Sequence, residues 1–207
     1  MINTFLKAKH WQLFLVMLGI PLLFQFYFMF NMFSEFETES NPNPENFKDI
    51  FQVFPIIMIL FTGVFFGWFW SIAIGLQKNI PEEIKMKVKK FKIFFFIPLI
   101  YIIFFMIYMG GIFSGMGTNV FPNEGRFVAI ILPLHLFSMF CIFYSMYFVA
   151  KTIKTAELQR KVGFGDFAGE FFLLWFYIIG IWIIQPKVNK LYGKENTTAN
   201  NVSYEKP

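Results

Sequence analysis

A small number of side chains in this sequence combine a titratable group with an apolar setting. His135 lies well inside a long apolar run. An ionisable residue at such a place indicates proton transfer or gating, or a neutral imidazole bonded to a neighbouring helix. Glu170 and Asp166 lie close together in the string FGDFAGEFF, after basic residues with which they could pair; they could also bind a cation or a lipid headgroup. Together these three residues define a candidate polar path.

The sequence offers little for covalent or metal chemistry. Ser114 and His135 belong to neighbouring apolar runs, as an intramembrane hydrolase would need, but Ser114 stands at the outer end of its run and His135 stands deeper. The single cysteine, Cys141, is expected to pack as a small apolar residue. No spacing of histidines, cysteines or carboxylates matches a known metal motif. We therefore predict no catalytic residues, no metal and no cofactor.

The composition places these residues in a membrane rather than in a soluble domain. Of the 207 residues, 57% are hydrophobic, 22% are aromatic and only 15% are charged. A soluble domain carries roughly 25% charged residues. Several apolar runs are longer than the stretch of about 18 residues that crosses the hydrocarbon core of a bilayer. The lysines flank these runs, so the net charge of +5 indicates membrane topology and not nucleic-acid binding.

The apolar runs predict an all-α integral membrane bundle. A short fifth hydrophobic helix is expected at residues 167–184, and its uninterrupted part is about 21 Å long, so it can enter a membrane without crossing it. Residues 1–193 then form one transmembrane domain, and the polar residues 194–207 are expected to be a disordered tail. The four spans are expected at about residues 11–33, 50–76, 91–113 and 127–150.

Each of the four expected spans carries one proline, and the spacing of the prolines is regular. Pro21 and Pro55 are 34 residues apart, and Pro98 and Pro133 are 35 residues apart. This regularity predicts two repeated helical hairpins, although coincidence is an alternative because proline is common in membrane-spanning helices. Proline removes one backbone hydrogen bond, so each span is expected to be kinked and packed against a neighbour.

Basic residues predict the orientation of the chain. Twelve lysines and arginines lie in the N-terminal segment and the connections 77–92 and 151–166, against two in the connections 34–49 and 114–126. Because basic residues accumulate on the cytoplasmic side, the N-terminus and both basic connections are expected there, with the cell (inner) membrane as the location. The side on which the C-terminus lies depends on whether the fifth helix crosses, which the sequence leaves open.

The basic connection 77–92 also carries candidate contacts to lipid. Its string NIPEEIKMKVKKFK predicts an interfacial helix, with Asn79 as N-cap and Ile84, Val88 and Phe91 on one face. Lysines on such a helix attract anionic headgroups, although topology alone would also place them at the surface. The candidate headgroup contacts are Lys85, Lys87, Lys89, Lys90 and Lys92.

Residues 63–75, GVFFGWFWSIAIG, place a small residue at every fourth position beside bulky aromatic residues. Such a row lies along one ridge of a helix and lets another helix approach closely. Small residues of the fourth span also share one face, so we expect the second and fourth helices to meet at the centre; oligomerisation around a pore is the alternative. The helix-packing candidates are Gly63, Gly67, Ser71 and Gly75 on one helix and Ser138, Cys141 and Ser145 on the other.

These features predict a non-enzymatic multi-pass membrane protein, acting as a scaffold or as a subunit of an oligomeric membrane complex or small channel. The expected partners are the lipid bilayer and further copies of the chain or other membrane subunits, and not nucleic acid. One alternative is a small transporter or proton-coupled unit in which His135 and Glu170 line a polar path. A second alternative is an intramembrane enzyme.

Overall fold

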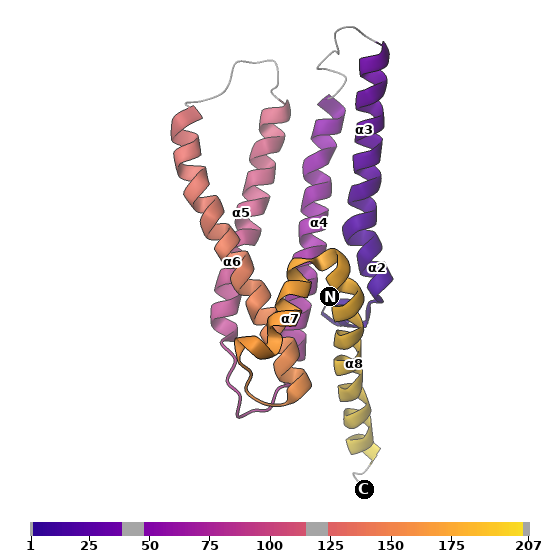
Figure 1. The fold of residues 1–207 in the computed structure, drawn as a ribbon, viewed down its shortest axis with the longest axis vertical. Helices are drawn as coiled ribbons and strands as arrows, with labels where there is room; N and C mark the ends of the chain where they lie inside the picture. The colour runs from indigo at the N-terminus through magenta and orange to yellow at the C-terminus, as the bar shows by residue number, and fades with distance from the viewer. Residues whose placement is uncertain (1, 39–47, 115–123, 205–207) are drawn as a thin grey trace.

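The computed structural model describes the backbone of residues 2–38, 48–114 and 124–204, which forms helices and no strands. Four stretches of the described residues are long and apolar enough to span a membrane: His10–Ser34, Val53–Asn79, Val88–Met109 and Ala129–Leu158. The predicted all-α bundle with four candidate spans is therefore confirmed. The long helices run along the bundle, and the C-terminal helices gather at one end of it (Figure 1). The elements are α1 (Ile2–Lys7), α2 (His10–Phe14), the π-helical turn η1 (Leu15–Gly19), α3 (Ile20–Thr38), α4 (Lys48–Gly75), the 3₁₀ turn η3 (Leu76–Asn79), α5 (Val88–Ser114), α6 (Glu124–Leu158), α7 (Phe164–Trp175) and α8 (Tyr177–Tyr204).

The prolines of the four spans all lie within helical segments. Pro55, Pro98 and Pro133 stand inside α4, α5 and α6. Pro21 stands just after η1, where the N–H of Ile20 bonds to the carbonyl of Leu15, five residues back. Proline cannot donate a hydrogen bond, and a wider turn of this kind is a common local adjustment to that loss. The predicted duplication of two hairpins stays a prediction.

The fourth span is longer than expected, because α6 continues from the apolar run through the basic residues to Leu158. Gln159 follows with a φ of 53°, a left-handed conformation that ends the helix. Its N–H bonds to the carbonyl of Thr155 at 2.9 Å, and its side-chain amide donates to the carbonyl of Asn79 at 2.7 Å. The end of α6 is therefore fastened to η3.

The interfacial helix predicted for the basic connection is wrong. Residues 80–87 are not helical; they contain one turn, in which the N–H of Ile84 bonds to the carbonyl of Pro81 at 2.9 Å, and α5 begins only at Val88. Lysines at 85 and 89 would face each other one turn apart in a helix, and such like-charge pairs destabilise an isolated helical turn. The lysines therefore lie on a loop and on the first turn of α5.

The single fifth helix predicted at residues 167–184 is also wrong, because the segment is a helical hairpin. The break is at Phe176, whose φ of −89° and ψ of 57° are not helical. In Figure 1, α7 rises toward the bundle and α8 returns to the end of the molecule from which α7 started. The hairpin therefore enters the bundle and turns back, as a short hydrophobic segment can.

The backbone of α8 continues to Tyr204, across most of the segment for which the sequence predicts a disordered tail. Residues 194–204 contain neither proline nor glycine, so nothing in the backbone chemistry interrupts the helix that precedes them. Residues 205–207 lie outside the described part of the chain.

The buried core lies at the end of the bundle where α7 and α8 pack. Large side chains with almost no exposed surface include Trp68 and Phe69 of α4, Ile153 of α6, Phe167 of α7 and Ile181 of α8. The other end of the bundle is thinly packed, and apolar side chains of α3 and α6 there are largely exposed. Such surfaces are suited to contact with lipid chains.

Candidate functional site

The row of small residues on α4 is covered by α1, a short N-terminal helix that the sequence did not predict. A Cβ atom on Gly67 would lie 2.9 Å from the ring of Phe5, and a Cβ atom on Gly75 would collide with Leu6. Ser71, between them, is buried and donates a hydrogen bond to the carbonyl of Gly67 at 2.7 Å. We call the surface formed by Gly67, Ser71 and Gly75 the glycine groove. Because the residues of this groove are small, α1 can lie directly on α4.

Gly63, the fourth small residue of the row, lies beyond α1. It is exposed, and a Cβ atom built there would have no neighbour within 4 Å. The helix that fills the glycine groove therefore differs from the expected one, because α1 takes the place that the sequence suggested for α6.

The small residues of α6 are all buried. Ser138, Cys141 and Ser145 have at most 2% of their surface exposed, and Ser145 donates to the carbonyl of Cys141 at 2.9 Å. Helices α4 and α6 contact each other, and both contact α5. These residues therefore lie in the packed interior of the helix bundle.

A buried amide on α8 holds α1 on the groove. The side-chain N–H groups of Gln185 donate to the carbonyls of Phe5 and Ala8 at 2.8 and 2.9 Å. Its carbonyl oxygen accepts the indole N–H of Trp68 at 2.8 Å. Gln185 is fully buried, and both its amide nitrogen and its carbonyl oxygen have partners on other helices or at their ends. The residue therefore links α8, α1 and α4.

Asn189, one turn further along α8, repeats this arrangement. Its side-chain amide donates to the carbonyls of Leu6 and Ala8 at 2.7 and 3.1 Å. The last carbonyls of a helix lack partners within that helix, so the two amides satisfy the C-terminal end of α1. The sequence indicates this role of the two amides only through their spacing: Gln185 and Asn189 are four residues apart in an otherwise apolar and basic segment.

His135 lies in the N-terminal half of α6 and is exposed. The hydroxyl of Tyr101 on α5 and Nδ1 of His135 are hydrogen-bonded at 3.1 Å, and the two ring centroids are 5.8 Å apart. Tyr101 is 7% exposed. The contact fastens α6 to α5 and leaves the other ring nitrogen of His135 directed away from it.

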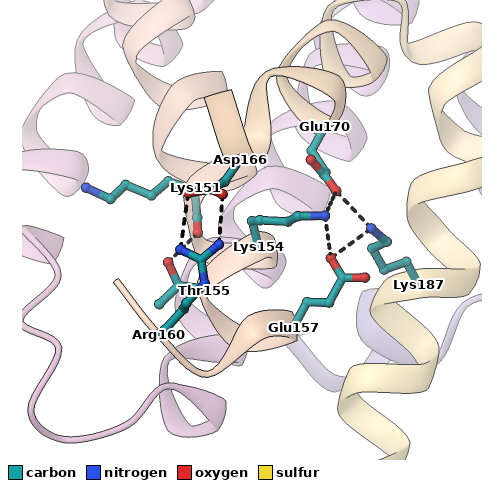
Figure 2. Close-up of polar contacts among 8 residues, drawn as sticks. All are labelled: Lys151, Lys154, Thr155, Glu157, Arg160, Asp166, Glu170 and Lys187. Carbon is teal, nitrogen blue, oxygen red and sulfur yellow. Dashed lines mark hydrogen bonds and ion pairs between the residues drawn. The ribbon is translucent and has the colours of Figure 1, made fainter. Parts of the chain in front are cut away.

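Glu170 belongs to a cluster of four charged residues that joins α6, α7 and α8 (Figure 2). Its Oε1 lies 2.8 Å from Nζ of Lys187 and 3.2 Å from Nζ of Lys154. Oε2 of Glu157 lies 3.0 and 2.9 Å from the same two ammonium groups. Two cations and two carboxylates thus balance each other, and we call these residues the ion-pair cluster.

Two effects act on the pKa of Glu170. Burial raises it, but hydrogen bonds from Lys187, Lys154 and the backbone, together with the charge of Lys187, outweigh burial, so the pKa lies below its ordinary value. The two ammonium groups therefore favour the charged form of this carboxylate.

Asp166 forms a separate pair at the start of α7. Its Oδ1 lies 2.9 Å from Nη2 of Arg160, and its Oδ2 accepts the backbone N–H of Gly163 at 2.8 Å. The Arg160 guanidinium, together with the Gly163 N–H, holds the pKa of Asp166 below its usual value. The carboxylate therefore stabilises the N-terminal end of α7, where negative charge is favoured.

The residues of the candidate polar path are not brought together. Lys154, which contacts Glu170, follows His135 by 19 residues on α6. At 1.5 Å per residue this is about 28 Å along the helix. Across the described residues, no three side chains of the metal-binding types gather at one place.

The candidate lipid contacts divide into two groups. Lys85, Lys87 and Lys90 line a cavity beside α6 and α7. Lys89 and Lys92 are not among the residues that line this cavity, and Nζ of Lys92 lies 5.7 Å from the ring centre of Trp70. The cavity has two further lysines, from the end of α6 and the connection after it, that the sequence did not single out: Lys151 and Lys161.

No protein-family model matches the chain, and no match is found among curated proteins or solved structures. The described part of the chain is an all-α bundle with four helices long and apolar enough to span a membrane.

Proposed function

We propose that this chain is a non-enzymatic multi-pass protein of the cell membrane that serves as a subunit of a homo-oligomeric membrane complex. The proposal is supported by what the polar residues do. Glu170 and Asp166 stabilise the α7–α8 hairpin, and Gln185 and Asn189 hold α1. These polar groups already have hydrogen-bond or ion-pair partners within the bundle, which supports a structural role for them.

The proposal rests mainly on His135, because one of its two ring nitrogens has no partner within the described residues. Its Nδ1 bonds to Tyr101, whereas Nε2 has no partner among the residues that the structure describes. Leu134, Leu136 and Phe137 beside it are 40%, 58% and 46% exposed, so the imidazole stands on an apolar surface at membrane depth. A polar atom without a partner in hydrocarbon is costly, and a hydrogen bond to another helix removes that cost.

A second copy of the chain is the simplest partner for this surface. Most oligomers are symmetric, and a two-fold axis brings the same patch of both copies together. Two His135 side chains then face each other, and one imidazole can donate the hydrogen bond that the other accepts. The exposed apolar residues around His135, in the N-terminal half of α6, then pack against the same residues of the second copy.

The hairpin supports an orientation with the N-terminus in the cytoplasm. Because α8 returns to the end where α7 begins, its lysines at 187, 190 and 194 join those of the two basic connections. Among the described residues, fifteen lysines and arginines then lie at one end of the bundle and two at the other, which favours the first end as the cytoplasmic one.

His135→Phe is expected to weaken self-association about fivefold, because one hydrogen bond between membrane helices contributes roughly 1 kcal/mol. The measurement is the monomer–dimer equilibrium of the purified full-length protein in detergent, by analytical ultracentrifugation. The matched control is His10→Phe, which replaces the other histidine, packed in a tilted contact against Trp182 of α8 with ring centres 4.7 Å apart. A wild-type protein that stays monomeric at all concentrations, or equal dimerisation of both variants, contradicts the proposal.

A further inference from the structure

A cavity of about 770 Å³ lies between the loop after η3, the first turn of α5, residues 140–151 of α6 and the start of α7. Its wall has a basic part and an aromatic part. The basic part consists of Lys85, Lys87, Lys90, Lys151 and Lys161. We call this space the lysine cavity. Its volume is within the range of sites that hold small-molecule ligands.

The aromatic part of the wall follows one stripe of α6. Phe140, Phe143, Tyr144 and Tyr147 are spaced so that they share a helix face, and Lys151 continues the same stripe. From Phe140 to Lys151 the stripe measures about 16 Å at 1.5 Å per residue. The lysine cavity is therefore an elongated slot that is apolar toward the middle of the bundle and basic at the end where the connections lie.

Within the described part of the chain, no acidic side chain forms an ion pair with a lysine of this cavity. The carboxylates of Glu157, Glu170 and Asp166 are taken by Lys154, Lys187 and Arg160. Figure 2 shows Lys151 pointing away from the ion-pair cluster.

Two further charged residues, Lys90 and Glu83, affect the balance of charge around the slot. Nζ of Lys90 lies 5.3 Å from the ring centre of Tyr144, a cation–π contact that leaves its positive charge uncompensated. One acidic residue, the exposed Glu83, lines a smaller adjoining space of about 310 Å³ that shares Lys85, Lys151 and Lys161. The balance of charge around the slot is therefore strongly positive.

We propose that the lysine cavity binds one anionic phospholipid. The phosphate lies among Lys85, Lys151 and Lys161, and an acyl chain lies along Phe140 and Phe143. Basic pockets between helices at the cytoplasmic side of membrane proteins are suited to anionic headgroups, and aromatic rings with one polar edge suit the membrane interface. A soluble phosphate would use the lysines but not the aromatic stripe. This site does not depend on self-association through α6.

The test is lipid binding to the purified full-length protein in detergent, followed by native mass spectrometry. We expect phosphatidylglycerol to bind at least tenfold more tightly than phosphatidylcholine with the same acyl chains. The double variant Lys151→Gln/Lys161→Gln is expected to lose about 30-fold in affinity, since each lysine near an anionic lipid contributes roughly fivefold. The variant Lys151→Arg/Lys161→Arg keeps the charge and should keep most of the binding.

The matched control is Lys89→Gln/Lys92→Gln, which removes the same charge from the neighbouring turn outside the cavity wall, and should stay within twofold of wild type. Equal loss in the control and in Lys151→Gln/Lys161→Gln overturns the proposal, because binding then follows overall charge. Glycerol phosphate binding as tightly as phosphatidylglycerol also overturns it, because the site then recognises free phosphate. If Lys151→Gln/Lys161→Gln fails to fold, the wild-type protein alone decides, and equal affinity for the two phospholipids overturns the proposal.

Discussion

Gln185→Leu is expected to lower the free energy of unfolding by about 3 kcal/mol, although leucine is apolar and close to glutamine in size. The substitution leaves two groups without their partners, the indole N–H of Trp68 and the carbonyl of Phe5, whereas the carbonyl of Ala8 still accepts the amide of Asn189. A buried polar group that loses its partner costs about 1–3 kcal/mol. The measurement is equilibrium unfolding of the purified protein in mixed detergent, followed by circular dichroism.

The matched control for this substitution is Gln25→Leu. Gln25 is an exposed residue of α3, with no hydrogen bond of its side chain in the described part of the chain. We expect its replacement to change the free energy of unfolding by less than about 0.5 kcal/mol. If both variants lose the same stability, Gln185 does not hold α1 on α4.

Gly180→Ala is expected to cost about 3 kcal/mol and to open the α7–α8 hairpin. A methyl group on residue 180 would collide with the backbone carbonyl of Leu173. A side chain could rotate away from such a contact, but a carbonyl inside α7 cannot move without breaking the helix, so the cost is at the upper end of overpacking effects. The turn itself is tight, with the N–H of Gly180 bonded to the carbonyl of Phe176 at 2.8 Å.

Gly169→Ala provides the control for this prediction. Gly169 lies inside α7, and a Cβ atom there would have no neighbour within 4 Å. Because alanine favours a helix more than glycine does, this variant should be unchanged or more stable by up to about 1 kcal/mol. Limited proteolysis reports the hairpin directly, and a Gly180→Ala protein as resistant as Gly169→Ala would contradict the account of the turn.

The four long helices could be predicted from the sequence because the signal is local. A run of apolar residues long enough to cross a bilayer is visible without knowledge of any partner. The short helix α1 could not be predicted in the same way. It has six residues, too few to be stable alone, and it depends on Gln185, which is 180 residues after Phe5.

The break at Phe176 also lacked a local signal. The residues around it, Trp175 and Tyr177, are large and apolar, and neither proline nor glycine marks the turn. Gly180, four residues later, is the residue that permits it, but a single glycine is also tolerated within an uninterrupted helix and so does not by itself predict a turn. The hairpin is therefore decided by contact between two helices and not by turn chemistry.

The charged residues show the same division between local and distant contacts. Asp166 pairs with Arg160, six residues before it, which the sequence allowed. Glu170 pairs instead with Lys154 and Lys187, and Lys187 reaches it only because α8 folds back beside α7. Likewise, Lys151 and Lys161 join the lysines near residue 85 only once α6 and α7 are packed.

The seating of α1 in the glycine groove is tested most directly by a cysteine cross-link in native membranes. Cγ of Leu6 lies 3.4 Å from the position of a Cβ atom on residue 75, which is within reach of a disulfide after Leu6→Cys and Gly75→Cys. Cys141→Ser removes the single native thiol. The control pair is Leu6→Cys with Gly63→Cys, which lies 12 residues earlier on α4, about 18 Å away.

Mild oxidation is expected to link residues 6 and 75 within one chain and to leave residues 6 and 63 unlinked. Absence of the first link, or equal formation of both, would contradict the placement of α1 in the groove.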